Sequence, residues 1–119
     1  MYLGGTIMKE YANLINAIID AINRDKVEDC HQELAALVEV AFSAMKFDLF
    51  TTLGVTRASY YFSGMDDLLR NFEDRTMGVT ALMHQLYNYF KNVCSSENIS
   101  DDRFVTTMNY IKMMTDIEW

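Results

Sequence analysis

Apolar residues recur every three or four positions along most of this chain, which is the spacing of one face of an α-helix. The first such run, IMKEYANLINAIIDAI, covers residues 7–22 and has its polar side chains on the opposite face. An aliphatic face this wide is unstable in water and must be covered by other segments. We therefore expect a helix that starts after an N-cap at Thr6, ends near Asn23–Arg24 and organises the core.

The next run predicts a long second helix. Asp25 is its expected N-cap, because Glu28 follows three residues later, as in a capping box. Apolar residues then recur at helical spacing as far as Leu53, and Gly54 supplies a stop signal. An unbroken helix would contain about 27 residues and span ~40 Å. The apolar period drifts between residues 43 and 47, which leaves open a kink or a break there.

The second half of the chain predicts three shorter helices after a loop. Residues 55–64 contain aromatic side chains without clean periodicity, so this segment is expected to be a loop with about one helical turn. The helices are expected over residues 65–73, from Arg75–Thr76 to about residue 95, and from residues 100–102 to about Asp116. The prediction for residues 1–119 is an all-α fold, a compact bundle of about five helices in a single domain.

Composition agrees with a helical fold that has one core. The chain has no proline and five glycines, and half of its residues are hydrophobic. Strands joined by tight turns would need more turn signals than this. A chain of 119 residues buries roughly two thirds of its unfolded surface, which is enough for a self-sufficient core. The expected core residues share inner positions on their helices: Leu14, Ile15, Ile18, Ile22, Leu34, Leu37, Val38, Leu82, Leu86 and Phe90.

Charge and targeting signals narrow the range of partners. The formal net charge is −7, and the ten lysines and arginines are dispersed along the chain. Nucleic-acid binding requires clustered cations that displace counterions from phosphate, so we expect none by this chain alone. Two cysteines make no disulfide framework, no apolar run is long enough to span a membrane, and no signal-peptide pattern is present. We expect a cytoplasmic protein without membrane contact.

Residues with catalytic or metal-binding chemistry are few. His31 and His84 are the only histidines, Cys30 and Cys94 the only thiols, and none has the spacing of a zinc motif. A Cys-His nucleophile would need a third, orienting group, and no glycine-rich phosphate loop or nucleophile elbow occurs. The adjacent pair Asp66-Asp67 suits helix capping better than acid–base catalysis. We expect no enzymatic activity, no metal and no cofactor.

Several segments together carry a family resemblance. Glu10 is followed by Leu14-Ile15-Asn16-Ala17-Ile18, then by a polar break over residues 23–26 and a helical run over residues 27–37. Further segments with similar helical patterns follow at residues 67–69, 83–93 and 104–112. The order of these segments resembles the helical region that precedes the DNA-binding domain in bacterial AraC-type transcription regulators, including YesN-like response regulators. Residues 42–64 depart from that pattern.

The resemblance implies a non-enzymatic regulatory and dimerisation module. Such a module would be a homodimer that passes a signal to a downstream DNA-binding domain absent from this chain, so the natural protein would continue past Trp119. The last predicted helix is then the signal-transmitting element. Its inner face, made by Phe104, Met108 and Ile111, is expected to dock on the bundle.

Two other functions remain open from the sequence. One is a stand-alone helical protein-interaction factor, for example of viral or phage type, that grips a helix in a groove. The other is a small-ligand sensor with a pocket lined by Tyr60, Tyr61, Phe62, Met83 and Tyr87. A stop codon directly after Trp119 would favour the first of these, and an empty apolar pocket inside the fold would favour the second.

Overall fold

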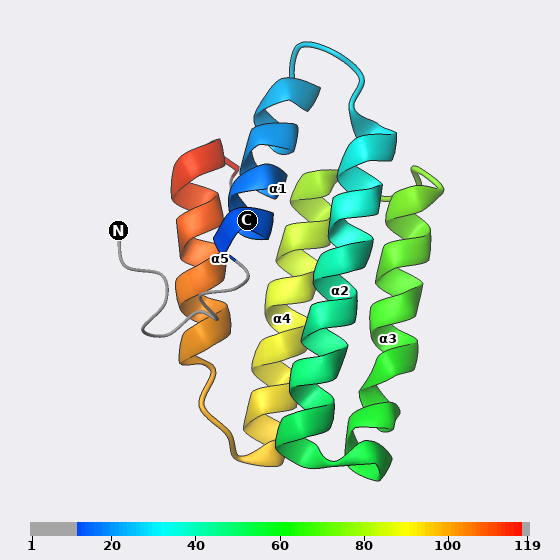
Figure 1. Ribbon diagram of the computed structural model, residues 1–119, viewed down its shortest axis with the longest axis vertical. Coiled ribbons are helices and arrows are strands. Elements are labelled where there is room, and N and C mark those ends of the chain that lie inside the picture. Colours follow the sequence, from blue (N-terminus) through cyan, green and yellow to red (C-terminus); the bar gives the residue numbers. More distant parts are fainter. Residues whose placement is uncertain (1–11, 118–119) are drawn as a thin grey trace.

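Five helices make up the described part of the chain. A computed structural model describes residues 12–117, apart from the side chain of Arg103, and contains no strand in this range. The helices are α1 (Ala12–Asp25), α2 (His31–Leu53), α3 (Val55–Glu73), α4 (Val79–Glu97) and α5 (Asp102–Thr115) (Figure 1). The predicted all-α bundle of about five helices is confirmed. The predicted N-cap at Thr6 and the start of the first helix lie outside the described residues.

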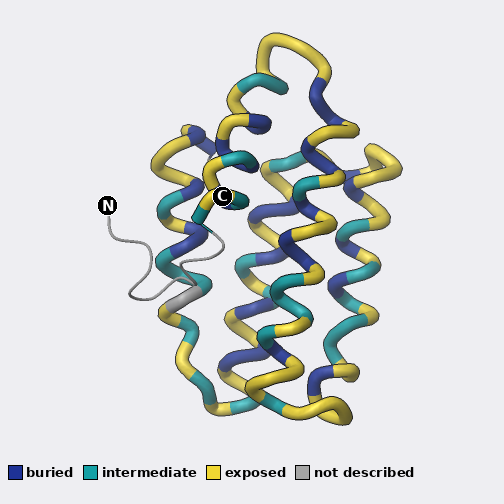
Figure 2. The backbone as a smooth tube through the Cα atoms, in the orientation of Figure 1, coloured by how far each residue is buried: buried dark blue, intermediate teal, exposed yellow. Residues whose placement is uncertain are grey.

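The helices form a ring of neighbours around one core. Each helix packs against the next one along the chain, and α5 returns against α1 to close the ring. Figure 2 shows buried and exposed positions alternating along each helix, as expected for helices with one inner face. The largest fully buried side chains come from all five helices: Ile22, Leu34, Phe42, Met65, Phe72, Leu82, Phe90, Cys94 and Thr115.

The predicted core residues lie inside the bundle. Ile15, Ile18, Ile22, Leu34, Val38, Leu82, Leu86 and Phe90 are all buried. Leu14 and Leu37 are only partly buried, although both pack against the core cluster.

The predicted start of the second helix is wrong by five residues, because the N-cap is Cys30 and not Asp25. Asp25 is the last residue of α1, and α2 begins at His31. The Asp25 carboxylate accepts the backbone N–H of Cys30 (2.8 Å), and Asp29 accepts that of His31 (3.1 Å). The two aspartates therefore stabilise a turn before the helix, and Glu28 completes no capping box.

The rest of α2 follows the prediction. The helix runs without a break through residues 43–47 and ends at Gly54, whose φ of 85° is a conformation that suits glycine. The 23 residues of α2 give a rod of about 35 Å.

The predicted loop over residues 55–64 is wrong, because this segment is the first half of α3. Its buried positions, Ala58, Met65, Leu68 and Phe72, continue one helical face from the segment into the predicted short helix. Exposed apolar residues, including Val55 and Tyr60, had hidden this period in the sequence.

The last two helices agree more closely with expectation. Arg75 has a φ of 61° and lies in the loop before α4, so this helix starts three residues later than the predicted opening at Thr76. The helix ends where Asn98 adopts a left-handed conformation, close to the predicted end. The α5 helix begins after Asp101 and ends before Asp116, as predicted.

Close packing between α3 and α4 leads to a first testable prediction. A Cβ atom added at Gly64 would lie 2.7 Å from the Tyr89 ring, whose hydroxyl donates to the backbone carbonyl of Tyr61. We expect Gly64→Ala to destabilise the fold, although alanine gains about 1 kcal/mol of helix propensity over glycine. In a Tyr89→Ala background the obstacle is gone, so the same change should become stabilising. Denaturant unfolding of the four variants of this double-mutant cycle measures the coupling; additive effects would contradict the contact.

Candidate protein-interaction surface

The α2 helix has apolar residues on two opposite sides. Its inner side carries Leu34, Val38, Phe42 and Leu49, all buried in the core. It is the most apolar of the five helices and at the same time the least amphipathic. A helix that is apolar all round normally has partners all round.

The outer side of α2 has no such partner in the described structure. Residues Ala36, Val40, Ser43, Ala44, Phe47, Phe50 and Thr51 form this surface, which we call the α2 outer face. Val40 is 56% exposed, Phe47 62% and Phe50 42%. The two phenylalanine rings stack on each other with centroids 6.5 Å apart, and this contact leaves much of both rings in water. The α2 helix lies at the front of the bundle in Figure 1.

The spacing of this surface is that of a helix–helix seam. The exposed positions 36, 40, 43, 47 and 50 follow one another by alternating steps of four and three. This is the repeat of the a and d positions in a coiled coil, which face a partner helix. None of the five seam positions carries a charged residue, although the chain as a whole has a net charge of −7.

Charged residues border the α2 outer face. Glu39 and Lys46 lie on the same edge, seven residues and therefore two turns apart. Lys46 also forms an ion pair with Asp66 of α3, and its ammonium lies 5.6 Å from the centre of the Phe62 ring. The arrangement is an apolar strip with a charged margin, as is common in protein interfaces.

The five residues predicted to line a ligand pocket are spread over two helices. Tyr60 is 76% exposed, whereas Met83 is buried in the core. Tyr61 donates a hydrogen bond to Glu97 near the end of α4, and Met83 lies fourteen residues before Glu97, or about 20 Å along that helix.

The remaining two pocket residues have other neighbours. Lys46 lies beside the Phe62 ring, and Lys91 lies 5.5 Å from the centre of the Tyr87 ring. None of the five residues lines the shallow depression between α3 and α4, where Gly64 and Tyr89 lie. The described structure therefore does not bring the five side chains to one place.

The predicted signal-transmitting face of α5 docks on the bundle. Met108 and Ile111 are buried, and the Phe104 ring stacks on Phe90 of α4 with centroids 4.1 Å apart. On its other side α5 contacts α1, where Tyr110 donates to the side-chain oxygen of Asn16 (3.3 Å).

One side chain of α1 and one from the turn after it hold the C-terminal end of α5. Asn23 donates to the carbonyl of Met114 (3.2 Å), and Lys26 donates to the carbonyl of Thr115. The last carbonyls of a helix lack partners within the helix and carry partial negative charge, so a lysine there is favourable. Sequence analysis missed both contacts, because they join residues 89 or more positions apart.

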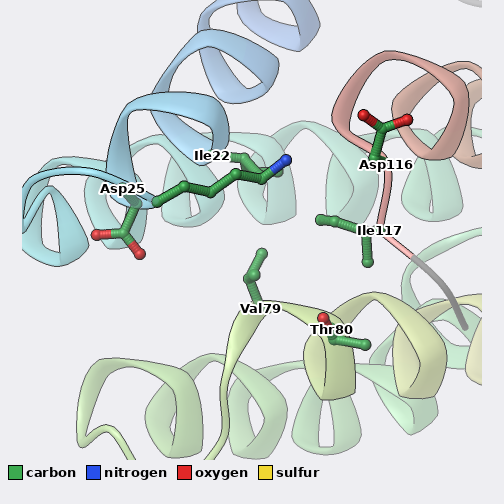
Figure 3. A pocket seen from close by; sticks show the side chains of 7 residues that line it. Ile22, Asp25, Val79, Thr80, Asp116 and Ile117 are labelled. Carbon is green, nitrogen blue, oxygen red and sulfur yellow. The ribbon is translucent and has the colours of Figure 1, made fainter.

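A shallow pocket lies beside this contact. It is lined by residues of α1, the start of α4 and the segment after α5, among them Ile22, Asp25, Val79 and Ile117. Figure 3 shows Asp25 and Asp116 on opposite sides of the opening, with Val79 and Ile117 between them. The Asp25 carboxylate is already bonded to the Cys30 amide, and the pocket is a junction of three chain segments.

The cysteines and the buried histidine are in structural environments. Burial raises the pKa of both the Cys30 and the Cys94 thiol, which keeps them protonated and weakly nucleophilic. Nε2 of His31 lies 2.6 Å from the carbonyl oxygen of Phe72; a carbonyl only accepts, so this nitrogen donates. Within residues 12–117 no group of three or more potential ligands is placed to hold a metal ion. No helix in the same range is both long and apolar enough to cross a membrane.

Ion pairs lower the pKa of three carboxyl groups. Hydrogen bonds from the His31 amide and from Arg75 lower the pKa of Asp29, and a hydrogen bond from Arg24 lowers the pKa of Glu33. The pKa of Glu97 is lowered by Arg57, at 2.7 Å, and by the Tyr61 hydroxyl.

These shifts predict a loss of stability in acid. The unfolded chain binds protons more tightly at the three carboxylates, whose ordinary pKa values are 3.8 and 4.5. Their contribution is therefore fully present above about pH 5 and is lost as the pH falls through the lowered folded values. Denaturant unfolding from pH 7 to pH 2.5 should show a plateau and then a decline. Arg57→Gln should flatten part of that decline, and an unchanged profile in this variant would contradict the role of Glu97.

Comparisons with known proteins found no relative of this chain. The chain matches no protein-family model, no curated protein and no solved structure. Its function has to be argued from the fold and from the α2 outer face.

Proposed function

We propose that this chain is a non-enzymatic regulatory and dimerisation module that docks through the α2 outer face. The observation that carries the proposal is the uncharged seam from Ala36 to Thr51, exposed on the most apolar helix of an acidic protein. Exposed apolar strips of this kind are typical of protein-interaction sites. In line with the resemblance to AraC-type regulators, the module belongs to a cytoplasmic bacterial transcription regulator and controls a DNA-binding domain that follows Trp119.

The helix ring offers a mechanical route for such control. The docking helix α2 packs on α1, and α1 and the turn after it hold the C-terminal end of α5 through Asn23 and Lys26. A partner that favours one arrangement of α2 would shift the position of α1 and hence of α5, as a two-state element requires. The α5 helix leads towards the chain end at which the DNA-binding domain is attached.

A stand-alone interaction factor would use the same surface. In that case the α2 outer face would bind a helix of another protein, and no DNA-binding domain would be attached. The two proposals differ in what lies after Trp119, and the exposed seam supports both. We favour the regulatory module because its segment order also resembles the AraC-type region.

A fusion experiment tests the proposal. A DNA-binding domain that occupies its operator only as a pair is joined after Trp119, and repression of a reporter gene is measured in cells. We expect strong repression by the fusion and loss of repression with Phe47→Ser. Tyr60→Ser, which removes an even more exposed aromatic residue outside the α2 outer face, should leave repression unchanged.

The same fusion tests the role of α5. Phe104→Ala removes the ring stacked on Phe90, so it should alter repression while the fusion still pairs. Repression no better than that of the unfused DNA-binding domain would overturn the proposal as a whole. If the Phe104→Ala fusion represses as the unchanged fusion does, α5 takes no part in the proposed control of the DNA-binding domain.

A further inference from the structure

We infer that the occupant of the α2 outer face is the same face of a second copy of this chain, packed antiparallel, with Glu39 of each copy beside Lys46 of the other. The inference rests on the proposed function and names its partner and register. A two-fold symmetric contact needs a surface that is complementary to itself. Three properties of the α2 outer face meet that requirement.

The first property is the pattern of large and small residues. Small and large residues alternate at four consecutive seam positions: Ala36, Val40, Ser43 and Phe47. In an antiparallel pair in which Val40 lies opposite Ser43 of the other copy, Phe47 lies opposite Ala36. Val40 and Phe47 then each meet a small side chain, which is the arrangement that lets two helices pack closely without voids.

The second property is the charge on the margin. In this register Glu39 and Lys46 both flank the seam on one edge, and the two-fold axis brings each glutamate next to the lysine of the other copy. Residues that flank a coiled-coil seam set partner choice and orientation through such ion pairs. Lys46 keeps its contact with Asp66 on its other side, since an ammonium has three donors.

Other registers lack this complementarity. A shift by one heptad along the same seam would place Lys46 against Lys46 of the second copy, which is repulsive. In a parallel pair Glu39 and Lys46 would face Ala44 and Thr51 respectively, so that neither charge would find a partner. The charges therefore select the antiparallel register in which Val40 faces Ser43.

The third property is the absence of charge on the seam itself. Two copies that each carry a net charge of −7 repel each other, and a long uncharged strip is where they can approach most closely. From residue 36 to residue 51 the strip is about 24 Å long. One helix pair of this length covers less than the ~800 Å² per partner of a standard interface, so we expect a reversible dimer in the micromolar range.

A charge-reversal experiment tests the register. Glu39→Lys places a lysine beside Lys46 of the other copy, and Lys46→Glu places a glutamate beside Glu39. Each variant alone should self-associate about tenfold more weakly than wild type, since two attractive contacts become repulsive. An equimolar mixture of the two variants should restore association, because both contacts of the mixed pair are attractive again. Sedimentation equilibrium measures all three samples, and circular dichroism confirms that each variant is folded.

Disulfide formation tests the direction independently. Ser43→Cys lies near the two-fold axis and should form a cross-linked dimer under mild oxidation. Ala36→Cys lies about 16 Å from its symmetry mate in the antiparallel pair and should not, whereas a parallel pair would cross-link both. Wild type is the control, since its two cysteines are buried.

The outcomes separate this inference from the proposed function. Restored association in the mixture, together with cross-linking at position 43 alone, supports the antiparallel pair. Cross-linking at both positions, or a mixture no stronger than its components, overturns the register. If neither position cross-links while Phe47→Ser still abolishes repression by the fusion, two copies pair through the α2 outer face in another arrangement, and only the antiparallel register fails. If neither position cross-links and Phe47→Ser leaves repression unchanged, both proposals are overturned.

Discussion

Replacing Phe72 with alanine is expected to lower the free energy of unfolding by about 3–5 kcal/mol, the range for removing a buried aromatic ring. Phe72 is 1% exposed near the end of α3, and its ring lies 4.6 Å from that of His31 at the start of α2. The His31 ring also bonds to the Phe72 carbonyl, so the two residues join the ends of the two helices. The change therefore removes core volume at a point where two helix ends are held together.

Chemical denaturation with a matched control measures this effect. Tyr60→Ala removes an aromatic ring from the same helix at a position that is 76% exposed, and it should cost less than about 0.5 kcal/mol. Equal losses in the two variants would show that α3 does not pack in the orientation described.

Ile18→Ala in α1 is expected to cost about 2–5 kcal/mol. Ile18 is 3% exposed and lies on the inner face of α1, between Ile15 and Ile22. Truncation leaves a cavity that the helices on either side of α1 cannot fill without moving. A loss below about 0.5 kcal/mol would place Ile18 in solvent and change the register of the whole helix.

Val27→Ala is the control for this change. It shortens a branched aliphatic side chain in the turn after α1, where the residue is 87% exposed, and should have almost no effect. The comparison separates the loss of core packing from the general effect of substituting an aliphatic residue.

The sequence predicted most of the fold because most helices have a single apolar face. The inner positions of α4 recur without interruption from Leu82 to Val93, and the element was predicted accordingly. The start of α2 was misplaced because Asp25 and Glu28 have the spacing of a capping box, whereas the Asp25 carboxylate bonds within the turn instead. Spacing alone does not show which backbone N–H a side chain will reach.

The errors in the middle of the chain have a common cause. Apolar residues on the outside of α2 and α3, such as Phe47, Phe50 and Tyr60, add a second pattern to the inner one. This second pattern caused the apparent drift between residues 43 and 47, and it hid the helical period of residues 55–64. The same residues that obscured the fold include those of the candidate site, because an interaction surface places apolar side chains where folding does not need them.

The candidate surface could be found only partly from the sequence. The alternation of steps of three and four from Ala36 to Phe50 is visible without a structure. The sequence does not show which of the two stripes of α2 faces outward, because both stripes are apolar. The orientation depends on how α1 and α3 pack around the helix. The contacts of Asn23 and Lys26 with the end of α5 were equally inaccessible, because no local pattern links residues so far apart.

Sedimentation equilibrium of the chain over a range of concentrations tests the central claim, that the α2 outer face is a docking surface, most directly. We predict that the average mass of wild type rises from one chain towards two with increasing concentration. Phe47→Ser should remain at the mass of one chain throughout, and Tyr60→Ser should behave as wild type. A wild type that stays at one chain, or a Phe47→Ser variant that dimerises as wild type does, would contradict the account.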